Sequence, residues 1–304
     1  MPEQLQEFRS GYVAIMGRPN VGKSTLLNLL LGQKVAAVSP RAQTTRRRQL
    51  GILTTSVAQV IFIDTPGMHK PVVKLGEYMV AEAMAALDNA DVVVVVVDAS
   101  HLPGPEDSLL VEHIAAVQPA PSLILALNKV DLVPPSEFEP IEAAYKALLP
   151  QAEPLVISAV SGFQCDLLLA KVIAWLPVGQ PFFDQEQVTD LYEREIASDL
   201  VREAALVHLR DEVPHAIAVR IDEFTERGEI GAYIAATLFV ERDSQKGIVI
   251  GQGGTMLKKI GASARQAIES MSGRKVYLEL HVKVEKNWRS NSEALRRLGY
   301  AHEE

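Results

Sequence analysis

The feature that most constrains the fold of this chain is the segment Gly17-Arg-Pro-Asn-Val-Gly-Lys-Ser24. It matches the pattern GxxxxGK[ST], and it lies between an apolar run typical of a strand (12–16) and a stretch typical of a helix (23–31). In that context glycines let backbone amides converge on phosphate oxygens at a helix N-terminus. Lys23 is expected to reach the β- and γ-phosphates, and Ser24 to ligate Mg²⁺. The segment predicts a nucleotide site, but alone it does not separate ATP from GTP.

The N-terminal part of the chain alternates strand-like and helix-like segments, which predicts a mostly parallel α/β sheet with helices on both faces. The six consecutive valines at 92–97 are typical of a strand that is buried on both sides. Strands are expected at 12–16, 60–63, 92–97, 123–127 and 155–157, and helices at 23–31, 75–87, 106–117, 138–149 and 165–175.

The pattern changes after Leu176, where PVGQPFFDQEQ brings two prolines and a glycine. Beyond it we expect a helix (188–209), two strands (216–224 and 233–240), two helical stretches joined by a glycine-rich turn, the second running to about 271, and a last strand (276–284). This α-β-β-α-α-β order predicts a second, α+β domain. The expected division is a nucleotide-binding domain over 1–179, a linker over 180–186 and the second domain over 187–304.

Two further segments are typical of a nucleotide switch. Asp64-Thr-Pro-Gly67 follows an apolar run, so the carboxylate is expected to hold Mg²⁺, through water, and the Gly67 amide to contact the γ-phosphate. Within residues 40–48, one threonine should complete the Mg²⁺ shell when the γ-phosphate is present. We favour Thr45 over Thr44.

The segment Asn128-Lys-Val-Asp131 follows the apolar run LILAL and predicts that the base is guanine. A carboxylate at 131 accepts two hydrogen bonds from the guanine ring nitrogen and exocyclic amine, a donor pair that adenine lacks. Asn128 is expected to tie the loop to neighbouring backbone, and the stem of Lys129 to cover the base. Ser158-Ala159 is expected to supply a backbone amide to the guanine oxygen.

Met68 and Asn20 bear on hydrolysis, and the arginines at 46–48 are a separate open question. Met68 stands where a glutamine would orient the attacking water, so slow intrinsic turnover is expected. Asn20 is open to two interpretations, a ligand of a K⁺ ion that replaces an arginine finger or a loop-stabilising amide. The arginines at 46–48 are open to three: a solvated loop, an RNA contact, or part of the switch.

The C-terminal part carries a Gly251-Gln-Gly-Gly254 turn between helical stretches. A GxxG loop in this setting lets a nucleic-acid backbone approach main chain closely, as in KH modules, which clamp about four nucleotides. Residues 242–297 hold twelve Lys or Arg and five Asp or Glu, although the whole chain has a net charge of −8. A local basic face favours RNA binding. The candidate RNA contacts are Lys246, Gly251, Gln252, Gly253, Gly254, Lys258 and Lys259.

Composition also suggests a compartment. The chain has one cysteine, Cys165, so no disulfide forms within it. It has no run of about 18 apolar residues and no apolar N-terminal signal segment. We expect a cytosolic protein, for which peripheral membrane contact remains open.

Together these motifs resemble the bacterial Era family, GTPases of the TrmE-Era-EngA-EngB-Septin-like class with a C-terminal KH domain. The resemblance covers nearly the whole chain: GRPNVGKSTLLN at 17–28, QTTR at 43–46, DTPG at 64–67, NKVD at 128–131, VIGQGG at 249–254 and RRLGY at 296–300. It implies an α/β P-loop GTPase domain and a type II KH domain. It also implies GTP/GDP and Mg²⁺ as ligands, binding of 16S ribosomal RNA near its 3′ end, a role in 30S subunit assembly, and peripheral association with the inner membrane. The chain departs from the family at Gln252-Gly253, where a basic residue is often present.

The candidate catalytic residues are Lys23, Thr45 and Gly67, and the candidate metal ligands are Ser24, Thr45 and Asp64. The candidate nucleotide site comprises Gly17, Arg18, Pro19, Asn20, Val21, Gly22, Lys23, Ser24, Thr25, Asp64, Thr65, Pro66, Gly67, Asn128, Lys129, Asp131, Ser158 and Ala159. Three alternatives stay open: a GTPase of tRNA modification or another branch of ribosome assembly, an RNA-binding module with a vestigial nucleotide domain, and an ATPase.

Overall fold

The computed structural model describes residues 7–39, 41, 43–227 and 231–300. Its contacts divide the chain into two units. The first comprises Met1–Ala36, Thr45–Lys70 and Met79–Asp190, and the second Ala37–Thr44, Pro71–Tyr78 and Leu191–Glu304. Two short segments of the N-terminal half therefore belong to the second unit.

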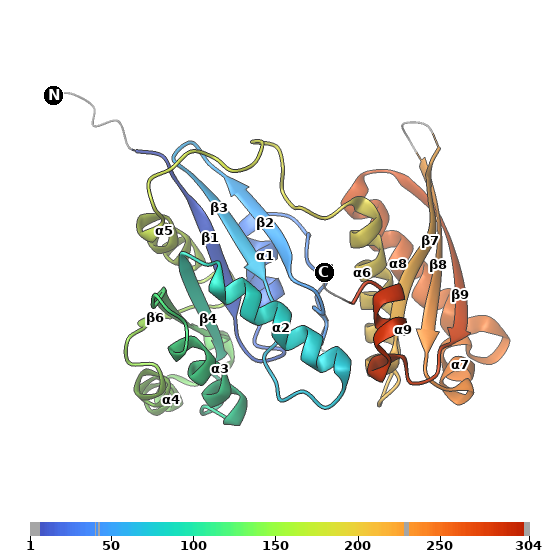
Figure 1. Ribbon diagram of the computed structural model, residues 1–304, viewed down its shortest axis with the longest axis horizontal. Coiled ribbons are helices and arrows are strands. Elements are labelled where there is room, and N and C mark those ends of the chain that lie inside the picture. Colours follow the sequence, from blue (N-terminus) through green and yellow to red (C-terminus); the bar gives the residue numbers. More distant parts are fainter. Residues whose placement is uncertain (1–6, 40, 42, 228–230, 301–304) are drawn as a thin grey trace. The chain divides into compact units, whose positions relative to one another are not determined.

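The first unit contains a six-stranded sheet in the order β2-β3-β1-β4-β5-β6 (Figure 1). All neighbouring strands are parallel except β2, which runs antiparallel to β3. The mostly parallel sheet predicted from the sequence is confirmed. Its strands are β1 (Arg9–Met16), β2 (Gln49–Thr54), β3 (Ala58–Asp64), β4 (Val92–Asp98), β5 (Ser122–Asn128) and β6 (Glu153–Val156).

Helices cover both faces of this sheet, and β4 shows how the sequence achieves it. Val92, Val94 and Val96 pack in one apolar core with α1 and α5, while Val93, Val95 and Val97 pack in the other with α2, α3 and α4. Side chains of a strand alternate between faces, so a continuous valine run supplies both cores. The helices are α1 (Lys23–Leu31), α2 (Lys74–Asp88), α3 (Pro105–Ala115), α4 (Pro135–Leu148) and α5 (Cys165–Trp175).

Strand β2 was not predicted, and the helix expected over 188–209 is shorter than expected. That helix is α6, which spans only Glu193–His208. It begins later than expected because the residues before it form hydrogen bonds with the edge of β2. The carbonyl of Val188 accepts a hydrogen bond from the Ile52 amide at 2.7 Å, and the Asp190 carboxylate accepts one from the Leu50 amide at 2.9 Å. Much of the expected linker also lies on the first unit, since the side-chain oxygen of Gln59 accepts hydrogen bonds from the amides of Phe182 and Phe183, and its nitrogen donates to the Phe183 carbonyl.

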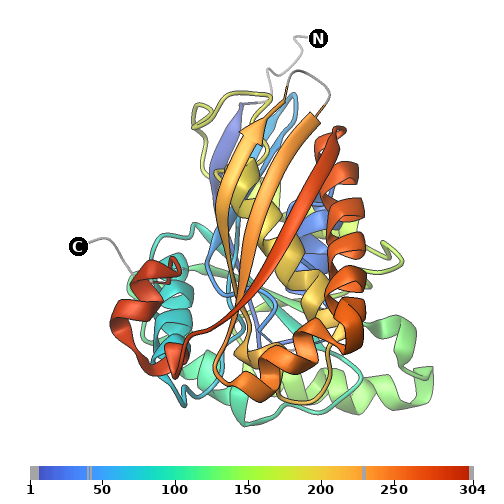
Figure 2. The same cartoon turned by 90° about the vertical axis from the view of Figure 1, so that its right-hand side faces the viewer.

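The second unit contains a three-stranded sheet in the order β7-β8-β9, with helices packed on one face (Figure 2). Strand β8 is antiparallel to β7 and parallel to β9. The α-β-β-α-α-β order predicted for this part is confirmed. Besides α6, its elements are β7 (Ala218–Glu226), β8 (Gly231–Val240), α7 (Asp243–Ile250), α8 (Thr255–Ser272), β9 (Lys275–Val284) and α9 (Ser292–Arg297).

Helix α9 was not predicted from the sequence. The buried Trp288, just before it, donates its indole N–H to the Ala216 carbonyl at 2.8 Å and stacks on Tyr300. These contacts anchor a six-residue helix that would not be stable alone. Across the described residues, no helix has the length and apolar character needed to cross a bilayer.

Candidate nucleotide and nucleic-acid sites

The predicted nucleotide motifs meet at one edge of the first sheet. Strands β1, β3, β4 and β5 run parallel, so their carboxyl ends lie at the same edge, where ligands of open α/β sheets bind. In this register Ile15 pairs with Asp64, and Asp98 with Asn128. The loop that follows Met16 therefore lies beside the loops that follow those strands.

The phosphate loop folds around the side chain of Lys23. This residue is only 6 % exposed, and its ammonium donates hydrogen bonds to the carbonyls of Gly17 (3.0 Å) and Arg18 (2.9 Å). At Gly22 the backbone has φ +103°, and a Cβ would lie 2.4 Å from the Asn128 side-chain nitrogen. Only glycine satisfies both constraints. The loop and a buried cation at the start of α1 fit the phosphates of a nucleotide.

Burial lowers the pKa of Lys23 to about 8, although the nearby Asp64 carboxylate opposes the shift. Without a nucleotide, the ammonium therefore loses its proton near neutral pH more readily than an exposed lysine does. Phosphate oxygens at contact distance would favour the charged form and raise this pKa again.

Binding of GDP is consequently expected to take up a proton at mildly alkaline pH. Affinity should fall as the pH rises above about 8, with a limiting slope of about tenfold per pH unit for one linked proton. Calorimetry in two buffers of different ionisation enthalpy would measure the uptake. Lys23→Gln should abolish it; an unchanged uptake in this variant would assign the proton to another group.

Three oxygen-bearing side chains come together beside Lys23. The hydroxyl of Ser24 donates to Asp64 Oδ2 at 2.7 Å, the hydroxyl of Thr45 donates to the same oxygen at 3.1 Å, and the two hydroxyls lie 3.0 Å apart. Oxygen ligands of this kind suit Mg²⁺, which usually keeps several waters. The Thr44 hydroxyl instead donates to the Arg41 carbonyl at 2.8 Å. The structure thus brings Thr45, and not Thr44, to the other candidate metal ligands.

The segment 64–67 packs directly on the phosphate loop. A Cβ on Gly67 would lie 2.6 Å from the Pro19 nitrogen, so the two backbones approach too closely for a side chain. Thr65 is buried, and its hydroxyl donates to the Ile15 carbonyl at 2.7 Å, which fastens the end of β3 to β1. Met68 is fully buried in the apolar core. The side chain at 68 therefore offers no polar group to an attacking water.

Asn128 joins the candidate guanine loop to its neighbours. Its side-chain nitrogen donates to the Val21 carbonyl at 2.7 Å, and its side-chain oxygen accepts from the Ala159 amide at 2.9 Å. Asp131 lies exposed at the surface, two residues after Lys129. The motif residues are therefore placed side by side, with the Asp131 carboxylate accessible to a base.

One expectation for this loop differs from the structure. The Ala159 amide is bonded to Asn128, and the Ser158 amide donates to the Phe163 carbonyl at 3.1 Å. Both amides that were expected to reach the guanine oxygen are thus engaged within the protein. The alternative donor is the next amide along the chain, that of Val160, whose side chain is 80 % exposed.

Sequence reasoning also missed Asp98, which follows the six valines. Its carboxylate accepts hydrogen bonds from Lys129 (2.7 Å) and from the amide and hydroxyl of Ser100. Burial alone would raise the pKa of Asp98, but these hydrogen bonds outweigh it and hold the pKa below its usual value. Asp98 therefore positions the ammonium of Lys129. Its place at the carboxyl end of a buried strand, like that of Asp64, was the available signal.

The environment of the arginines at 46–48 is visible only in the structure. Arg46 is 2 % exposed, so the solvated-loop interpretation is wrong for this residue. Within the second unit the buried Arg202 of α6 donates to the carbonyls of Gln43 (3.1 Å) and Thr44, and to Asp199. These carbonyls immediately precede Thr45. Pro40 and Ala42 of the same segment lie outside the described residues.

The candidate RNA loop lies between α7 and α8. Gly251 has φ +71°, and a Cβ there would lie 2.8 Å from Met256, whereas nothing lies within 4 Å of a Cβ on Gly253 or Gly254. Gln252, Lys258 and Lys259 are exposed around this loop, and Lys246 is half-buried. The outer side of the turn is therefore open to a nucleic-acid backbone.

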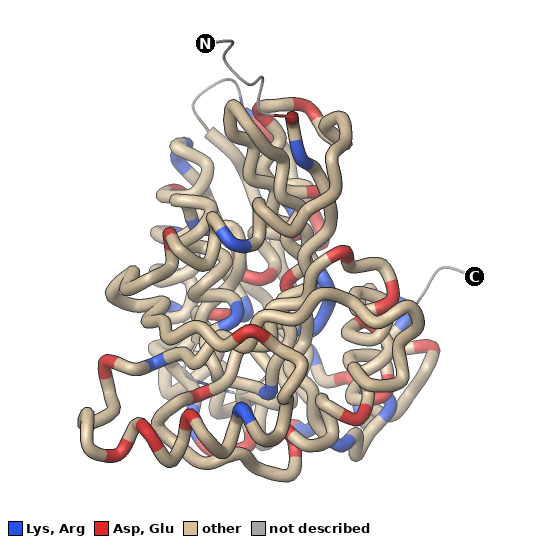
Figure 3. Tube along the Cα trace, turned by 90° about the vertical axis from the view of Figure 1, so that its left-hand side faces the viewer, with Lys and Arg blue, Asp and Glu red and all other residues tan. Residues whose placement is uncertain are grey.

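The charges around the loop are only partly compensated. Of the basic residues in 242–297, Arg274, Arg289 and Arg297 form ion pairs with glutamates. In the described part of the chain no ion pair involves Lys246, Lys258 or Lys259. Elsewhere acidic and basic residues are interspersed along the trace (Figure 3). The uncompensated lysines beside the GxxG loop suit a phosphate backbone.

Comparisons with known proteins cover both units. A family model described as 50S ribosome-binding GTPase matches residues 12–129, and a KH domain model matches residues 212–289. GTPase Era of Lacticaseibacillus paracasei is 45 % identical over 296 residues, covering 97 % of this chain and 98 % of the relative. GTPase Era of Leuconostoc citreum is 47 % identical over 297 residues, with the same coverage.

Two solved structures are similar over nearly the whole chain. One is Era in complex with MgGDPNP and nucleotides 1506–1542 of 16S ribosomal RNA, and the other is a variant of Aquifex aeolicus Era bound to GDP and AlF4⁻. Each has a TM-score of 0.92 and 41 % sequence identity, and each comparison covers 97 % of this chain and 100 % of the solved chain.

Proposed function

The chain belongs to the GTPase Era family, and from this premise we propose that it is a GTP-hydrolysing switch that binds 16S ribosomal RNA near its 3′ end during assembly of the 30S subunit. The observation that carries the proposal is the presence in one chain of two sites. One is the oxygen cluster of Ser24, Thr45 and Asp64 beside the phosphate loop, and the other is an open GxxG loop flanked by uncompensated lysines. The complex of a relative with 16S RNA nucleotides supports the RNA assignment.

In the proposed reaction the protein contributes charge stabilisation and position rather than a proton acceptor. The Lys23 ammonium and the Gly67 amide would contact oxygens of the γ-phosphate, where negative charge develops. Bound Mg²⁺, held by Ser24, Asp64 and Thr45, would neutralise further charge there. Since Met68 is buried, no side chain at 68 orients the water, and slow intrinsic turnover is proposed. The exposed Asn20, with φ +65°, remains a candidate ligand for K⁺.

We further propose that nucleotide state sets the RNA-binding state. The free-energy difference between the two states must come from contacts that exist only with the γ-phosphate, here those of Thr45 and Gly67. Arg202 holds the carbonyls of Gln43 and Thr44, and Thr45 is the next residue. The proposed domains are residues 1–179 and 187–304, joined by 180–186. The proposed location is the cytoplasm, with the peripheral inner-membrane association that the family resemblance implies.

The alternative functions are less well supported. A GTPase of tRNA modification, or of another ribosome-assembly branch, is expected to lack a KH domain, whereas the KH model matches residues 212–289 here. A vestigial nucleotide domain would have no need for the complete nucleotide site that this chain retains. That site combines the buried Lys23, the oxygen atoms around Asp64 and the exposed Asp131. Multiple-turnover release of phosphate from GTP would exclude that alternative.

RNA binding at the GxxG loop is testable at Gln252. A substitution at Gly251 would strain the turn itself, because of its φ and the nearby Met256. Gln252 is exposed, so Gln252→Asp adds a negative charge next to the RNA backbone without disturbing packing. We expect about tenfold weaker binding of an oligonucleotide from the 3′ end of 16S RNA, and tighter binding for Gln252→Lys.

Fluorescence anisotropy at two salt concentrations would measure these affinities. Gln151→Asp makes the same change at an exposed position of the first unit and should leave RNA binding unaltered. If Gln252→Asp binds the RNA as tightly as the parent protein at low salt, the loop is not the RNA site.

A further inference from the structure

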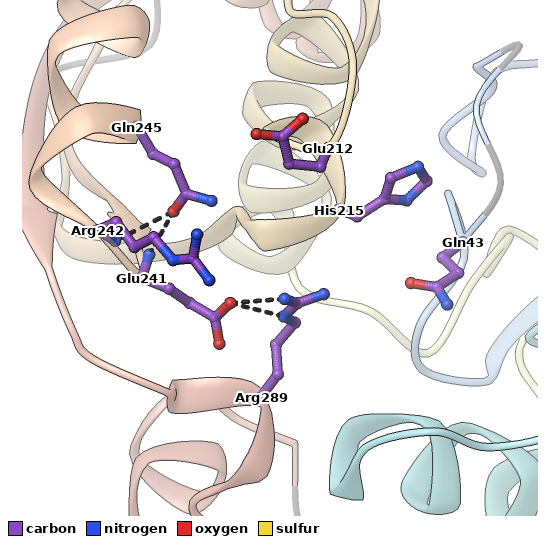
Figure 4. A pocket seen from close by; sticks show the side chains of 7 residues that line it. All are labelled: Gln43, Glu212, His215, Glu241, Arg242, Gln245 and Arg289. Carbon is purple, nitrogen blue, oxygen red and sulfur yellow. Dashed lines mark hydrogen bonds and ion pairs between the residues drawn. The ribbon is translucent and has the colours of Figure 1, made fainter.

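A cavity lies in the second unit, at the N-terminal end of α7 and so at the opposite end of that helix from the GxxG loop (Figure 4). Its volume is about 330 Å³, at the small end of the range for small-molecule sites. The lining residues are Gln43, Glu212, His215, Glu241, Arg242, Gln245 and Arg289.

The amide of Gln245 is a fixed hydrogen-bond donor to this cavity. The side chain is 6 % exposed, and its oxygen accepts hydrogen bonds from the amides of Glu241 (2.9 Å) and Arg242 (3.1 Å), which caps α7. Exchanging the oxygen and nitrogen would break both bonds, so the orientation of the amide is determined. Its nitrogen consequently points away from the capped backbone, toward the interior of the cavity (Figure 4).

A second donor is held in place by Glu241. The Arg289 guanidinium donates through Nε (3.1 Å) and Nη2 (2.6 Å) to one oxygen of this carboxylate. Two N–H donors that share one acceptor oxygen restrict the orientation of the guanidinium. One edge of the Arg289 side chain is thereby held at the rim of the cavity (Figure 4).

Two exposed side chains at the cavity are not held in place. Among the described residues, Arg242 and Glu212 take part in no ion pair, and their side chains project from different sides of the cavity (Figure 4). The Arg242 guanidinium is planar and able to stack on an aromatic ring, and the Glu212 carboxylate is able to accept N–H donors. Both groups are free to adjust to a ligand.

The lining favours an uncharged ligand with polar edges. Two arginines face two glutamates, so the formal charges balance, which does not suit a phosphate or an acidic peptide. A nucleobase carries donors and acceptors along its edges and has flat faces, and proteins bind unstacked bases by stacking on arginine and by hydrogen bonds to base edges. Gln245 would donate to a base oxygen or ring nitrogen, and Glu212 would accept from an exocyclic amine.

We propose that this cavity binds an unstacked nucleobase, supplied by single-stranded RNA or by a free nucleotide. The RNA source rests on the proposed function of the GxxG loop. Helix α7 has eight residues and is therefore about 12 Å long, so an RNA strand leaving the clamp along α7 reaches the cavity. The cavity would then add a base contact outside the roughly four nucleotides that a KH module clamps.

The structure offers a conservative variant for the test. Gln245→Glu retains the oxygen that caps α7 and replaces the donating nitrogen by an acceptor. Arg242→Ala removes the stacking group, whose side chain is exposed and forms no ion pair among the described residues. Arg210→Ala is the matched control, an exposed arginine of the same unit that does not line the cavity.

The full chain, saturated in turn with GDP and with a non-hydrolysable GTP analogue, would be titrated with a 4-nucleotide and a roughly 10-nucleotide RNA from the 3′ end of 16S RNA. Both Gln245→Glu and Arg242→Ala should weaken binding of the longer RNA about tenfold, leave the shorter one unchanged, and leave thermal unfolding close to that of the parent protein. Gln252→Asp should weaken both RNAs. A second arm titrates the four nucleoside monophosphates; binding that is lost in both cavity variants identifies a free nucleotide as the ligand.

If Gln245→Glu and Arg242→Ala bind the RNAs and the monophosphates as tightly as Arg210→Ala does, the cavity does not bind a base. This conclusion does not depend on the result for Gln252→Asp. If Gln252→Asp leaves RNA binding unaltered while the cavity variants weaken it, the GxxG assignment fails and the cavity assignment stands. If the protein binds neither RNA, the proposed RNA function fails, and the monophosphate arm alone decides the cavity.

Discussion

Replacement of Asp131 by asparagine should turn a GTP-binding protein into one that prefers XTP. The carboxylate is expected to accept two hydrogen bonds from guanine, and hydrogen bonds to charged groups contribute about 1.5–3 kcal/mol each. Loss of both predicts a fall in GTP affinity of about 10²–10⁴-fold. Asparagine also presents an N–H donor to the additional oxygen of xanthine, so XTP affinity should rise. The side chain is exposed, so the fold should tolerate the change.

Dissociation constants for GTP, XTP and ATP would measure the switch. Asp88→Asn, an equally conservative change at an exposed position on α2, should leave all three unaltered. Retention of the guanine preference by the Asp131 variant would mean that another group reads the base. A parent protein that does not distinguish GTP from ATP would favour the ATPase alternative.

The second large effect is expected at Thr45. Its hydroxyl lies 3.0–3.1 Å from those oxygens of Ser24 and Asp64 that are candidate metal ligands. Thr45→Ala should lower the rate of GTP hydrolysis by about 10²–10³-fold, the loss typical of a group that stabilises developing charge. Affinity for GDP should change little, because this ligand is proposed to act only when the γ-phosphate is present.

Thr44→Ala is the matched control for this prediction. The Thr44 hydroxyl donates to the Arg41 carbonyl, so its removal should affect hydrolysis far less. Single-turnover assays over a range of Mg²⁺ concentrations would separate metal binding from chemistry. A larger loss of activity in the Thr44 variant than in the Thr45 variant would assign the metal ligand to Thr44.

The sequence was most informative where the function depends on local chain geometry. The phosphate loop, Asp64 and Asn128 each lie at the carboxyl end of a strand. Because parallel strands bring these ends to one edge of the sheet, the sequence motifs were sufficient to predict that the three lie close together. The GxxG turn between α7 and α8 was likewise readable from glycine spacing.

What the sequence did not reveal depends on contacts between distant positions. Strand β2 is short, and its edge forms hydrogen bonds with Val188 and Asp190. No local sequence pattern at those positions predicts this pairing. An arginine in a helix such as α6 is usually expected to point into solvent. Arg202 is instead buried, and it donates a hydrogen bond to the carbonyl of Thr44, 158 positions earlier in the chain. The Ala159 amide was assigned to the base because the motif does not show that the Asn128 side chain takes it.

The placement of residues 37–44 with the second unit, and of Thr45 with the first, has a mechanical consequence. Neighbouring Cα atoms are held about 3.8 Å apart by a planar peptide bond, so the linkage between Thr44 and Thr45 cannot lengthen. If the γ-phosphate displaces the backbone of Thr45, we therefore expect the adjacent Thr44 carbonyl, which accepts a hydrogen bond from Arg202, to move with it. This link between the units is covalent. Added salt, which screens charges and weakens RNA contacts, therefore does not weaken it.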